Sequence, residues 1–587
     1  MSPLVYKAVG SGQQPAPNMT SYSEWRRSFS WENVWNELGA SPGGPLNIAE
    51  IALDRHARGT NANRVALRVL DQELHATSLT YRELGALVNR FVNALGALEV
   101  PRGAVIASFM GRLPELYVTA LGALKSGCSY CPLFSAFGPE PAKARLALGA
   151  VRVLVTTDLL YRRKIAPIRA ELPELRHVLL VRISAGSELP AGTTDFHALI
   201  DQQSEHATAS ATGCEDPALL HFTSGTTGKP KGVVHVHAAI VAQYLSAKIA
   251  LDLHPEDVYW CTADPGWVTG TAYGIIGPLA CGVPAIVDSE EFDVQRWYTI
   301  LERERVSVWY TAPTAIRMLM KAGHEPLAGH DFKALRFLGS VGEPLNPEAV
   351  IWGAENLGLP FHDNWWQTET GAIMVANYAC MDIRPGSMGR PLPGVEAGVV
   401  ERREDGSVAA LEAPEQVGEL ALRPGWPSMF RGYLNDPERY AACFENGWYL
   451  TGDLARRDAD GYYWFIGRAD DVIKSAGHLI SPFEVESALM LHPAVAQAAV
   501  IGVPDPLIYQ AVKAFVELKP GVTNDEALSR ALLSHARKSL GAAVAPREIV
   551  VVETLPRTRS GKIMRRLLRA RELGLPEGDL STLETRA

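Results

Sequence analysis

Helical stretches alternate with short apolar runs along much of this chain. Between residues 46 and 160 the helical pattern TYRELGALVNRFVNAL is followed by the apolar runs AVIASFM and VRVLVTT, and the alternation resumes after residue 216 and continues to about residue 380. Parallel strands need a long crossover connection, which is usually a helix, so this pattern is typical of βα units. The sequence therefore predicts an α/β fold built on parallel sheets.

The pattern changes twice in the second half of the chain. Residues 385–470 hold short strand-like runs between Gly, Pro and Asp turns, which predicts a β-rich subdomain. Further on, Ser481, Pro482 and Glu484 form a good helix start, because Ser caps the N-terminus, Pro suits the first helical position and Glu returns to the cap. A separate α+β domain is expected around this helix.

The length of 587 residues exceeds the roughly 250–300 residues at which single cores stop growing, so several domains are expected. We predict a Trp-, Ser- and Pro-rich extension over 1–45, a large domain over 46–469 and a small, mobile C-terminal domain over 470–587. The expected fold class is α/β: a large N-terminal domain of parallel-sheet βα subdomains plus a β-rich subdomain, followed by the α+β domain.

Charge and hydropathy exclude two classes of partner. Acidic residues outnumber basic ones by 65 to 56, whereas proteins that bind nucleic acid usually carry a basic excess. No apolar run approaches the roughly 20 residues of a membrane helix, and the N-terminus lacks the basic start and apolar stretch of a secretory signal. We therefore expect a cytoplasmic protein that binds neither nucleic acid nor a membrane.

The cysteines do not predict a metal site. The chain has seven, and Cys128 and Cys131 form a lone C-x-x-C with no second pair, whereas structural zinc usually takes four ligands. Seven is also too few, and odd, for a disulfide framework. We expect Cys128 and Cys131 to be small buried thiols.

The segment LLHFTSGTTGKPKGVVHVH, residues 219–237, carries the clearest chemistry. Two apolar runs flank a loop in which glycines let backbone amides approach an anion, hydroxyls donate hydrogen bonds and lysines supply charge. It is not a Walker A loop, because Pro230 stands where that loop has Ser or Thr after its lysine. A phosphate-binding loop is predicted, formed by Thr223, Ser224, Gly225, Thr226, Thr227, Gly228 and Lys229.

This loop resembles the signature of the adenylate-forming superfamily. Segments similar to others of that superfamily follow in its order: SVGEP at 340–344, DNWWQTETG at 363–371, YLTGD at 449–453, GRADD at 467–471 and RSGK at 559–562. The stretches WCTADPGWVTGTAYG, VGEPLNPEA, WWQTETG and LPRTRSGKIMRR are similar to those of acetyl-CoA synthetases, and SPFEVESAL and RPGWPSMF to their shorter bacterial form.

The resemblance implies an AMP-forming ligase. Acetate would attack the α-phosphate of Mg²⁺-bound ATP to give acetyl-adenylate and pyrophosphate, and the thiol of coenzyme A would then displace AMP. Two alternatives stay open: a ligase for propionate or another short-chain acid, and a non-catalytic relative that binds an adenine nucleotide.

The same resemblance assigns roles to residues. Lys562, Glu369 and Thr223 would be catalytic: Lys562 would bridge the acyl carboxylate and the α-phosphate, and Glu369 would hold Mg²⁺. Because acetylation would remove the charge of Lys562, a lysine acetyltransferase and a deacetylase are expected partners. Beyond the loop, nucleotide binding would involve Gly342, Glu343, Pro344, Asp363, Asn364, Trp365, Trp366, Gln367, Thr368, Asp453 and Arg468, with Trp365 beside the adenine and Asp453 and Arg468 at the ribose.

Substrate selection and the second half-reaction are assigned in the same way. Trp366 would close the acyl pocket, whose remaining wall would be Val268, Thr269 and Val341. Coenzyme A would meet Thr269, Ala476, Gly477 and Arg537, with Arg162 and Arg163 as weaker candidates, and Asp470 would be the hinge of the C-terminal domain. The chain departs from the family pattern at Leu479, where relatives carry an arginine near the phosphates, and at Ala476, which lacks a hydroxyl.

Overall fold

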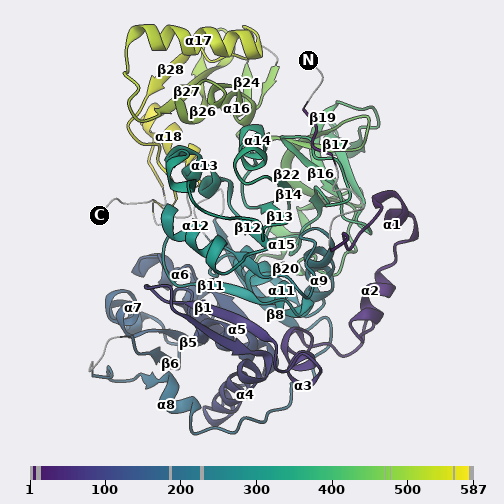
Figure 1. Ribbon diagram of the computed structural model, residues 1–587, viewed down its shortest axis with the longest axis vertical. Helices are drawn as coiled ribbons and strands as arrows, with labels where there is room; N and C mark the ends of the chain where they lie inside the picture. Colours follow the sequence, from purple (N-terminus) through teal and green to yellow (C-terminus); the bar gives the residue numbers. More distant parts are fainter. Residues whose placement is uncertain are drawn as a thin grey trace.

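The computed structural model describes residues 4–7, 15–183, 188–224, 230–469, 471–475, 478–558 and 562–578, together with 580 and 583. In Figure 1 the C-terminal segment, drawn in yellow-green and yellow, forms a separate body at the top, and the rest of the chain lies below it. The first residues, drawn in purple, run along one side of the lower body.

The first sheet contains the predicted βα units. Its strand order is β20-β9-β8-β4-β3-β5-β6-β7, and the pairs from β8 through β4, β3, β5 and β6 to β7 are parallel. The helix predicted from TYRELGALVNRFVNAL is α4, whose N-terminus has a full capping box between Thr80 and Glu83. The strands are β3 (Val105–Phe109), β4 (Ser129–Pro132), β5 (Val151–Thr157), β6 (His177–Val181), β7 (Thr194–Asp195), β8 (Pro217–Ser224), β9 (Pro230–Val236) and β20 (Gly432–Tyr433).

A second, longer path of paired strands runs β18-β17-β19-β22-β23-β16-β15-β14-β13-β12-β10-β11-β1-β2. From β14 through β13, β12, β10 and β11 to β1 the neighbours are parallel, which agrees with the alternation seen in the sequence. These strands are β1 (Val65–Leu70), β2 (Ala76–Thr80), β10 (Tyr259–Cys261), β11 (Ala285–Asp288), β12 (Val308–Thr311), β13 (Phe337–Ser340) and β14 (Phe361–Trp365).

The β-rich segment predicted over 385–470 extends this path through antiparallel pairs that begin at β14 and β15. With β15 as the link, its strands continue the ladder of the parallel sheet by hydrogen bonding, except β20, which pairs with β9 in the first sheet. They are β15 (Val375–Ala376), β16 (Ser387–Pro391), β17 (Ala397–Arg402), β18 (Val408–Ala410), β19 (Val417–Leu422), β21 (Phe444–Glu445), β22 (Trp448–Arg457) and β23 (Tyr463–Arg468).

Helices cover both sheets. They are α3 (Arg55–Arg58), α4 (Tyr81–Ala97), α5 (Pro114–Lys125), α6 (Pro139–Leu148), α7 (Asp158–Leu160), α8 (Phe196–Ile200), α9 (Ala239–Ile249), α10 (Val268–Thr271), α11 (Gly277–Cys281), α12 (Val294–Arg303), α13 (Pro313–Ala322), α14 (Pro347–Asn356) and α15 (Pro437–Ala441). Short π-helical turns span Glu50–Asp54, Tyr161–Ile165 and Ala272–Ile276, and 3-10 turns span Ala166–Glu171 and Glu325–Leu327.

The C-terminal body is an α+β unit. The helix predicted from Ser481 is α16 (Pro482–Met490), and the Ser481 hydroxyl accepts a hydrogen bond from the Glu484 amide. Its sheet and further helices are β24 (Ile473–Ser475), β25 (His478–Ile480), β26 (Val495–Asp505), β27 (Tyr509–Leu518), β28 (Glu548–Val551), α17 (Glu526–Leu540) and α18 (Arg565–Leu573). It contacts the large body where Asn346 Nδ2 donates to Ser487 Oγ at 2.7 Å, and Lys321 lies 3.8 Å from the Glu517 carboxylate.

The described part of the N-terminal segment packs on the large body. It forms α1 (Tyr22–Ser28) and α2 (Trp31–Glu37), and the Trp31 indole donates to the Gly394 carbonyl at 3.1 Å. Position 394 requires glycine: its φ is +85°, and a Cβ there would lie 2.0 Å from the Phe29 ring. The extension and the domain beneath it are therefore closely fitted.

The cysteine prediction is confirmed, since Cys128 and Cys131 are both buried and unpaired. Burial raises the pKa of the Cys131 thiol to about 12, so it stays protonated and is a poor metal ligand. Within the described residues, no helix is long and apolar enough to cross a membrane.

Candidate active site

Two of the predicted nucleotide segments start at the same edge of the long sheet. β13 ends at Ser340 and leads into Val341–Pro344, whereas β14 ends at Trp365 and leads into the turn that carries Glu369. The two strands are parallel neighbours, with Ser340 opposite Asp363. In open α/β sheets ligands bind outside the carboxyl ends of the strands, so this edge is where a ligand is expected.

Asp453, predicted at the ribose, lies on β22 and is 4% exposed. Its Oδ2 accepts hydrogen bonds from Trp365 Nε1 at 2.9 Å and from Gln367 Nε2 at 2.8 Å, and its Oδ1 lies 3.2 Å from the Arg468 guanidinium. Burial raises the pKa of the Asp453 carboxyl, and the charges of Arg468 and Lys562 oppose this rise. Three predicted nucleotide residues are thus joined to one carboxylate.

Gln367 is fixed from both ends of its amide. Nε2 also donates to the Thr451 carbonyl at 2.9 Å, and Oε1 accepts from the Tyr449 hydroxyl at 2.9 Å. An amide bound at both its oxygen and its nitrogen has one orientation, so Gln367 presents its N–H group to Asp453. Tyr449 imposes this orientation. In the sequence it was identified only as a member of the YLTGD segment.

Glu369 lies in the turn after β14 and is half-buried. Its Oε1 accepts a hydrogen bond from the Tyr433 hydroxyl at 2.9 Å, and the Lys231 ammonium lies 5.7 Å from the centre of the Tyr433 ring. Burial lowers the pKa of Lys231, Arg439 lowers it further, and the Glu369 carboxylate opposes both. Tyr433 was not predicted, since a Gly-Tyr pair in a turn-rich segment carries no signal of its own.

The backbone around Glu369 is held by donors from other elements. The Thr368 carbonyl lies 2.7 Å from Nε2 of the buried His235, and the Glu369 carbonyl accepts from the Phe430 amide at 3.0 Å. The Thr370 carbonyl accepts from the Trp426 indole and the Ser428 hydroxyl, at 2.9 and 2.7 Å. These bonds fix where the Glu369 side chain begins.

The segment after β13 is open at its first glycine. Gly342 is exposed, has φ +94°, and a Cβ there would meet no atom within 4 Å. Glu343 is already engaged: its carboxylate accepts from Arg317 Nη2 and from the Thr314 hydroxyl, each at 2.6 Å. The backbone of this segment, more than the Glu343 carboxylate, is therefore available to a ligand.

Asp363 and Asn364 lie within β14, and both are buried. Burial holds the pKa of the Asp363 carboxyl well above its usual range, and Oδ1 has no hydrogen-bond partner in the described part of the chain. Asn364 Oδ1 accepts from the Tyr310 hydroxyl at 3.0 Å. Asp363 and Asn364 are therefore suited to support the candidate site from below.

The predicted acyl-pocket residues come from three neighbouring elements. Val268 and Thr269 open α10 and are half-buried, whereas Val341 is 3% exposed at the end of β13. The Trp366 ring is half-buried and packs edge-on against Tyr273, with ring centroids 5.1 Å apart and an interplanar angle of 81°. Trp366 is thus fixed on one side by a fully buried tyrosine.

Lys562 lies before α18 and is exposed. Its backbone amide donates to the Thr558 hydroxyl at 3.0 Å and its carbonyl accepts from the Thr558 amide at 2.8 Å, which closes the turn. The charge of its side chain acts on the buried Asp453. Lys562 is therefore the residue of the C-terminal body whose charge is felt at this predicted ribose position.

Other predicted residues are not brought to this edge or are not described. Arg537 lies in the last turn of α17, which forms the outer end of the C-terminal body in Figure 1. Arg162 and Arg163 lie in the π-helical turn Tyr161–Ile165, where Arg162 donates to the Glu188 carbonyl. Thr223 is the last residue but one of β8 and lies opposite Lys231. Outside the described residues lie Gly225, Thr226, Thr227, Gly228, Lys229, Asp470, Ala476 and Gly477, and the side chains of Ser224 and Leu479.

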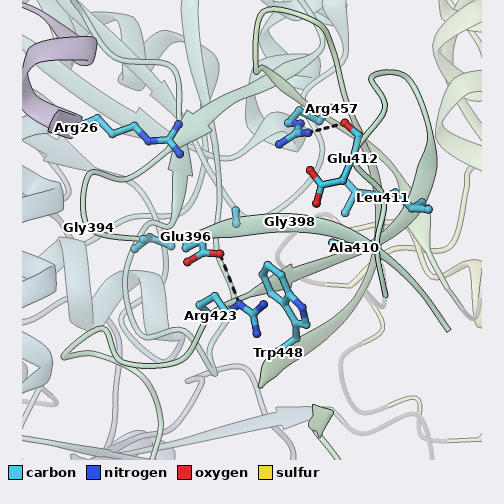
Figure 2. Close-up of a pocket in the computed structure, with 13 residues that line it drawn as sticks. Arg26, Gly394, Glu396, Gly398, Ala410, Leu411, Glu412, Arg423, Trp448 and Arg457 are labelled. Carbon is cyan, nitrogen blue, oxygen red and sulfur yellow. Dashed lines mark hydrogen bonds and ion pairs between the residues drawn. The ribbon is translucent and has the colours of Figure 1, made fainter. Parts of the chain in front are cut away.

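A hollow of about 560 Å³ lies elsewhere, beside β17, β19 and β22. Figure 2 shows two contacts among its charged groups: Arg423 lies 3.6 Å from the Glu396 carboxylate and Arg457 donates to the Glu412 carbonyl at 3.1 Å. The Arg423 guanidinium also lies 3.8 Å from the centre of the Trp448 ring. Because none of the predicted site residues lines this hollow, it is not the candidate active site.

Two known sequence families match most of the chain. The model of the AMP-binding enzymes matches residues 53–434, and that of the AMP-binding enzyme C-terminal domain matches residues 484–562. The acetyl-coenzyme A synthetase of Bacillus subtilis is 45% identical over 97% of this chain and 98% of its own length. That of Methanothrix thermoacetophila is 40% identical over 96% of this chain and 89% of its own length.

Solved structures agree with these matches. An acyl-CoA synthetase from Brucella canis superimposes with a TM-score of 0.74 at 37% identity, over 95% of this chain and 99% of that one. The anthranilate CoA ligase AuaEII, solved with anthranoyl-AMP, gives a TM-score of 0.81 at 29% identity, over 90% of this chain and 97% of that one. The predicted fold class and the resemblance drawn from the motifs are confirmed, and the chain belongs to the AMP-binding enzyme family, within it to the acetyl-CoA synthetases.

Proposed function

We propose that this chain ligates acetate to coenzyme A at the expense of ATP, through an acetyl-adenylate intermediate, with release of AMP and pyrophosphate. The observation that carries the proposal is the buried carboxylate of Asp453, which accepts hydrogen bonds from Trp365 and Gln367 and lies 3.2 Å from the Arg468 guanidinium. The charge of Lys562, from the C-terminal body, also acts on it. A carboxylate accepts two hydrogen bonds from a vicinal diol, so Asp453 suits a ribose. A cation beside that ribose would be close to the phosphate attached at its 5′ position.

Lys562 has the central role in adenylate formation. The first step brings a carboxylate anion against a polyanionic triphosphate, so a cation is needed where the charges meet. An exposed ammonium on a flexible stem supplies this charge without a fixed partner. When acetate attacks, the Pα–O bond to pyrophosphate breaks, and the positive charge offsets the charge that develops at the α-phosphate.

The site suits Mg²⁺ because Glu369 is a half-buried carboxylate with one oxygen held by Tyr433. Mg²⁺ is usually bound by one or two carboxylates together with substrate phosphates. Glu369 would hold the ion, which neutralises phosphate charge when bound. Lys231 lies on β9, beside the strand β8 that leads into the predicted phosphate loop, and it would meet the phosphates themselves.

The acyl preference follows from the size of Trp366. An indole that closes the pocket leaves room for about a methyl group beside Val268, Thr269 and Val341. One additional methylene is discriminated by only about 1–3 kcal/mol, so propionate is expected as a slow second substrate. Acetate is therefore the preferred acid, and propionate is not excluded.

The second half-reaction rests on residues predicted from the family. Rotation about Asp470 would replace Lys562 by the segment of Ala476 and Gly477, where the pantetheine arm of coenzyme A passes close to the backbone, with Thr269 and Arg537 along its path. Acetylation of Lys562 by an acetyltransferase, and its reversal by a deacetylase, would switch the first half-reaction. A cytoplasmic location would supply all three substrates.

Acetate-dependent exchange of labelled pyrophosphate into ATP tests the proposal, followed by detection of acetyl-CoA after addition of coenzyme A. We expect both signals, with propionate giving a weaker one. A stronger signal with propionate would identify the enzyme as a ligase for that acid. Binding of ATP without any exchange for any short-chain acid would identify a non-catalytic relative and overturn the proposal.

A further inference from the structure

Tyr433 lies between two groups of opposite charge at the candidate active site. Its hydroxyl donates to Glu369 Oε1 at 2.9 Å, and the Lys231 ammonium lies 5.7 Å from its ring centre. Lys231 and Glu369 attract each other, since the carboxylate raises the pKa of the lysine. Nevertheless the two groups form no ion pair in the part of the chain that the structure describes.

The position of Tyr433 is imposed by its surroundings. It lies on β20, which pairs antiparallel with β9 so that Tyr433 is opposite Val233. Its ring packs edge-on against Phe430, with centroids 5.2 Å apart, and the residue is 8% exposed. Phe430 in turn donates its amide to the Glu369 carbonyl. The phenol and the glutamate backbone are therefore parts of one rigid unit.

The hydroxyl stays a donor under all ordinary conditions. Burial and the Glu369 charge hold the pKa of Tyr433 far above its usual range, so the phenol keeps its proton. Among the residues that the structure describes, Tyr433 is the one that hydrogen-bonds to the Glu369 carboxylate. Without this donor the Glu369 carboxylate could turn toward Lys231, whose charge already interacts with it. A pair between them would remove both groups from a metal-bound triphosphate.

From these contacts we propose that Tyr433 is a positioning residue that holds Glu369 apart from Lys231, so that the carboxylate stays available to Mg²⁺ and the ammonium to the phosphates. The proposal rests on the function proposed above, because that function requires a metal-bound nucleotide at Glu369. In this role Tyr433 would bind neither the metal ion nor the phosphates. It acts by fixing the direction of one carboxylate oxygen.

The variant Tyr433→Phe tests the proposal, because it removes one oxygen and keeps the ring between β9 and Phe430. We expect the affinity for an ATP analogue with a non-cleavable α–β bond to fall about tenfold in the presence of Mg²⁺, since a hydrogen bond to a charged group is lost. The affinity for the same analogue in EDTA should stay within about twofold. Isothermal titration calorimetry measures both values, and Mn²⁺ paramagnetic resonance counts the bound metal directly.

Tyr440→Phe is the matched control. Tyr440 packs on the same Phe430 ring, with centroids 4.9 Å apart, but has no bond to Glu369. It should bind the metal-bound analogue like the unchanged protein. Glu369→Gln provides the second control: adding Tyr433→Phe to it should weaken metal binding no further, since the carboxylate that the phenol positions is already gone.

Exchange kinetics separate positioning from simple loss of structure. In Tyr433→Phe the half-saturating Mg²⁺ concentration should rise while the rate at saturating Mg²⁺ stays close to that of the unchanged protein. Equal losses of affinity with Mg²⁺ and in EDTA, or no loss of Mn²⁺ binding, would overturn the proposal. Failure of the proposed function would look different, as metal-dependent nucleotide binding without acetate-dependent exchange in the unchanged protein.

Discussion

The indole N–H of Trp365 donates a hydrogen bond to Oδ2 of Asp453 at 2.9 Å. The two residues are 88 positions apart in the chain and meet because β14 and β22 belong to the same path of paired strands. The bond fixes one carboxylate oxygen, while Oδ1 faces Arg468. A ribose bound here would meet a carboxylate whose orientation is already set, which reduces the ordering that binding must impose.

Asp453→Asn should weaken AMP binding at least tenfold. The amide keeps the size of the side chain but loses the charge that pairs with Arg468, and its N–H₂ group would face another donor, either Gln367 Nε2 or Arg468. Calorimetric titration with AMP measures the effect. Asp458→Asn is the control, because Asp458 pairs with Arg384 away from the site and should leave AMP affinity unchanged. An unaltered affinity in Asp453→Asn would remove this residue from the nucleotide site.

Lys562→Ala should abolish acetate-dependent pyrophosphate exchange and largely spare the formation of acetyl-CoA from supplied acetyl-adenylate. The bridging cation is needed only while two anions approach each other. The control is Lys538→Ala, which removes an ammonium from the last turn of α17. Exchange that persists in Lys562→Ala would contradict the role given to this lysine. Enzymatic or chemical acetylation of Lys562 should reproduce the variant, since it removes the same charge.

Trp366→Gly should shift the preference from acetate toward acids of about four to eight carbons. Each methylene that fills the space of the indole contributes about 0.8 kcal/mol, or about fourfold in kcat/KM. Exchange rates over a series of straight-chain acids give the profile. Trp464→Gly is the control: it removes a half-buried indole that bonds to Asp458, and the protein should still prefer acetate. A folded Trp366→Gly protein that still prefers acetate would place the acyl pocket elsewhere.

Glu348→Gln should stabilise the protein above neutral pH. Burial in the first turn of α14 raises the pKa of Glu348 to about 7, and Oε2 has no partner among the described residues. The folded state then binds a proton that the unfolded state has released between pH 4.5 and about 7, so the free energy of unfolding falls as pH rises through this range. Above pH 7 the ionised Glu348 lowers the free energy of unfolding by at most about 3 kcal/mol.

Thermal unfolding at several pH values measures this effect. The unfolding midpoint of Glu348→Gln should lie above that of the unchanged protein at pH 8 and coincide with it near pH 4.5, where both side chains are neutral. Glu355→Gln, on the same helix, is the control and should show no such pH dependence. A difference that is independent of pH would mean that the carboxyl of Glu348 titrates normally.

Much of the fold was predictable from local patterns. Ser481 forms the helix cap that its spacing to Glu484 predicts, because capping depends on a few consecutive residues. The alternation of helices and apolar runs likewise predicts the parallel strands. The continuation of β14 into β15 and the β-rich segment was not predicted, since pairing between edge strands depends on the whole sheet and leaves no mark on either sequence.

Sequence motifs predicted the main residues of the candidate site, but they did not predict the residues that hold those side chains in place. Glu369 and Asp453 were identified as members of quoted segments. Tyr433 and Tyr449, which fix Glu369 and Gln367, lie 64 and 82 residues from their partners. A single tyrosine has no spacing rule that would reveal such a distant contact. His235 is similar: it follows the phosphate loop in sequence, but its contact with the Thr368 carbonyl exists only in the fold.

The register of β22 and β23 places Asp453 directly opposite Arg468, two residues before the predicted hinge at Asp470. A ribose that engages Asp453 competes for the same carboxylate oxygen that Arg468 faces. Under the proposed function, binding of a ribose would therefore change the contacts of Arg468, across one pair of strands, two residues before the predicted hinge. Nucleotide binding would then come before any movement at that hinge.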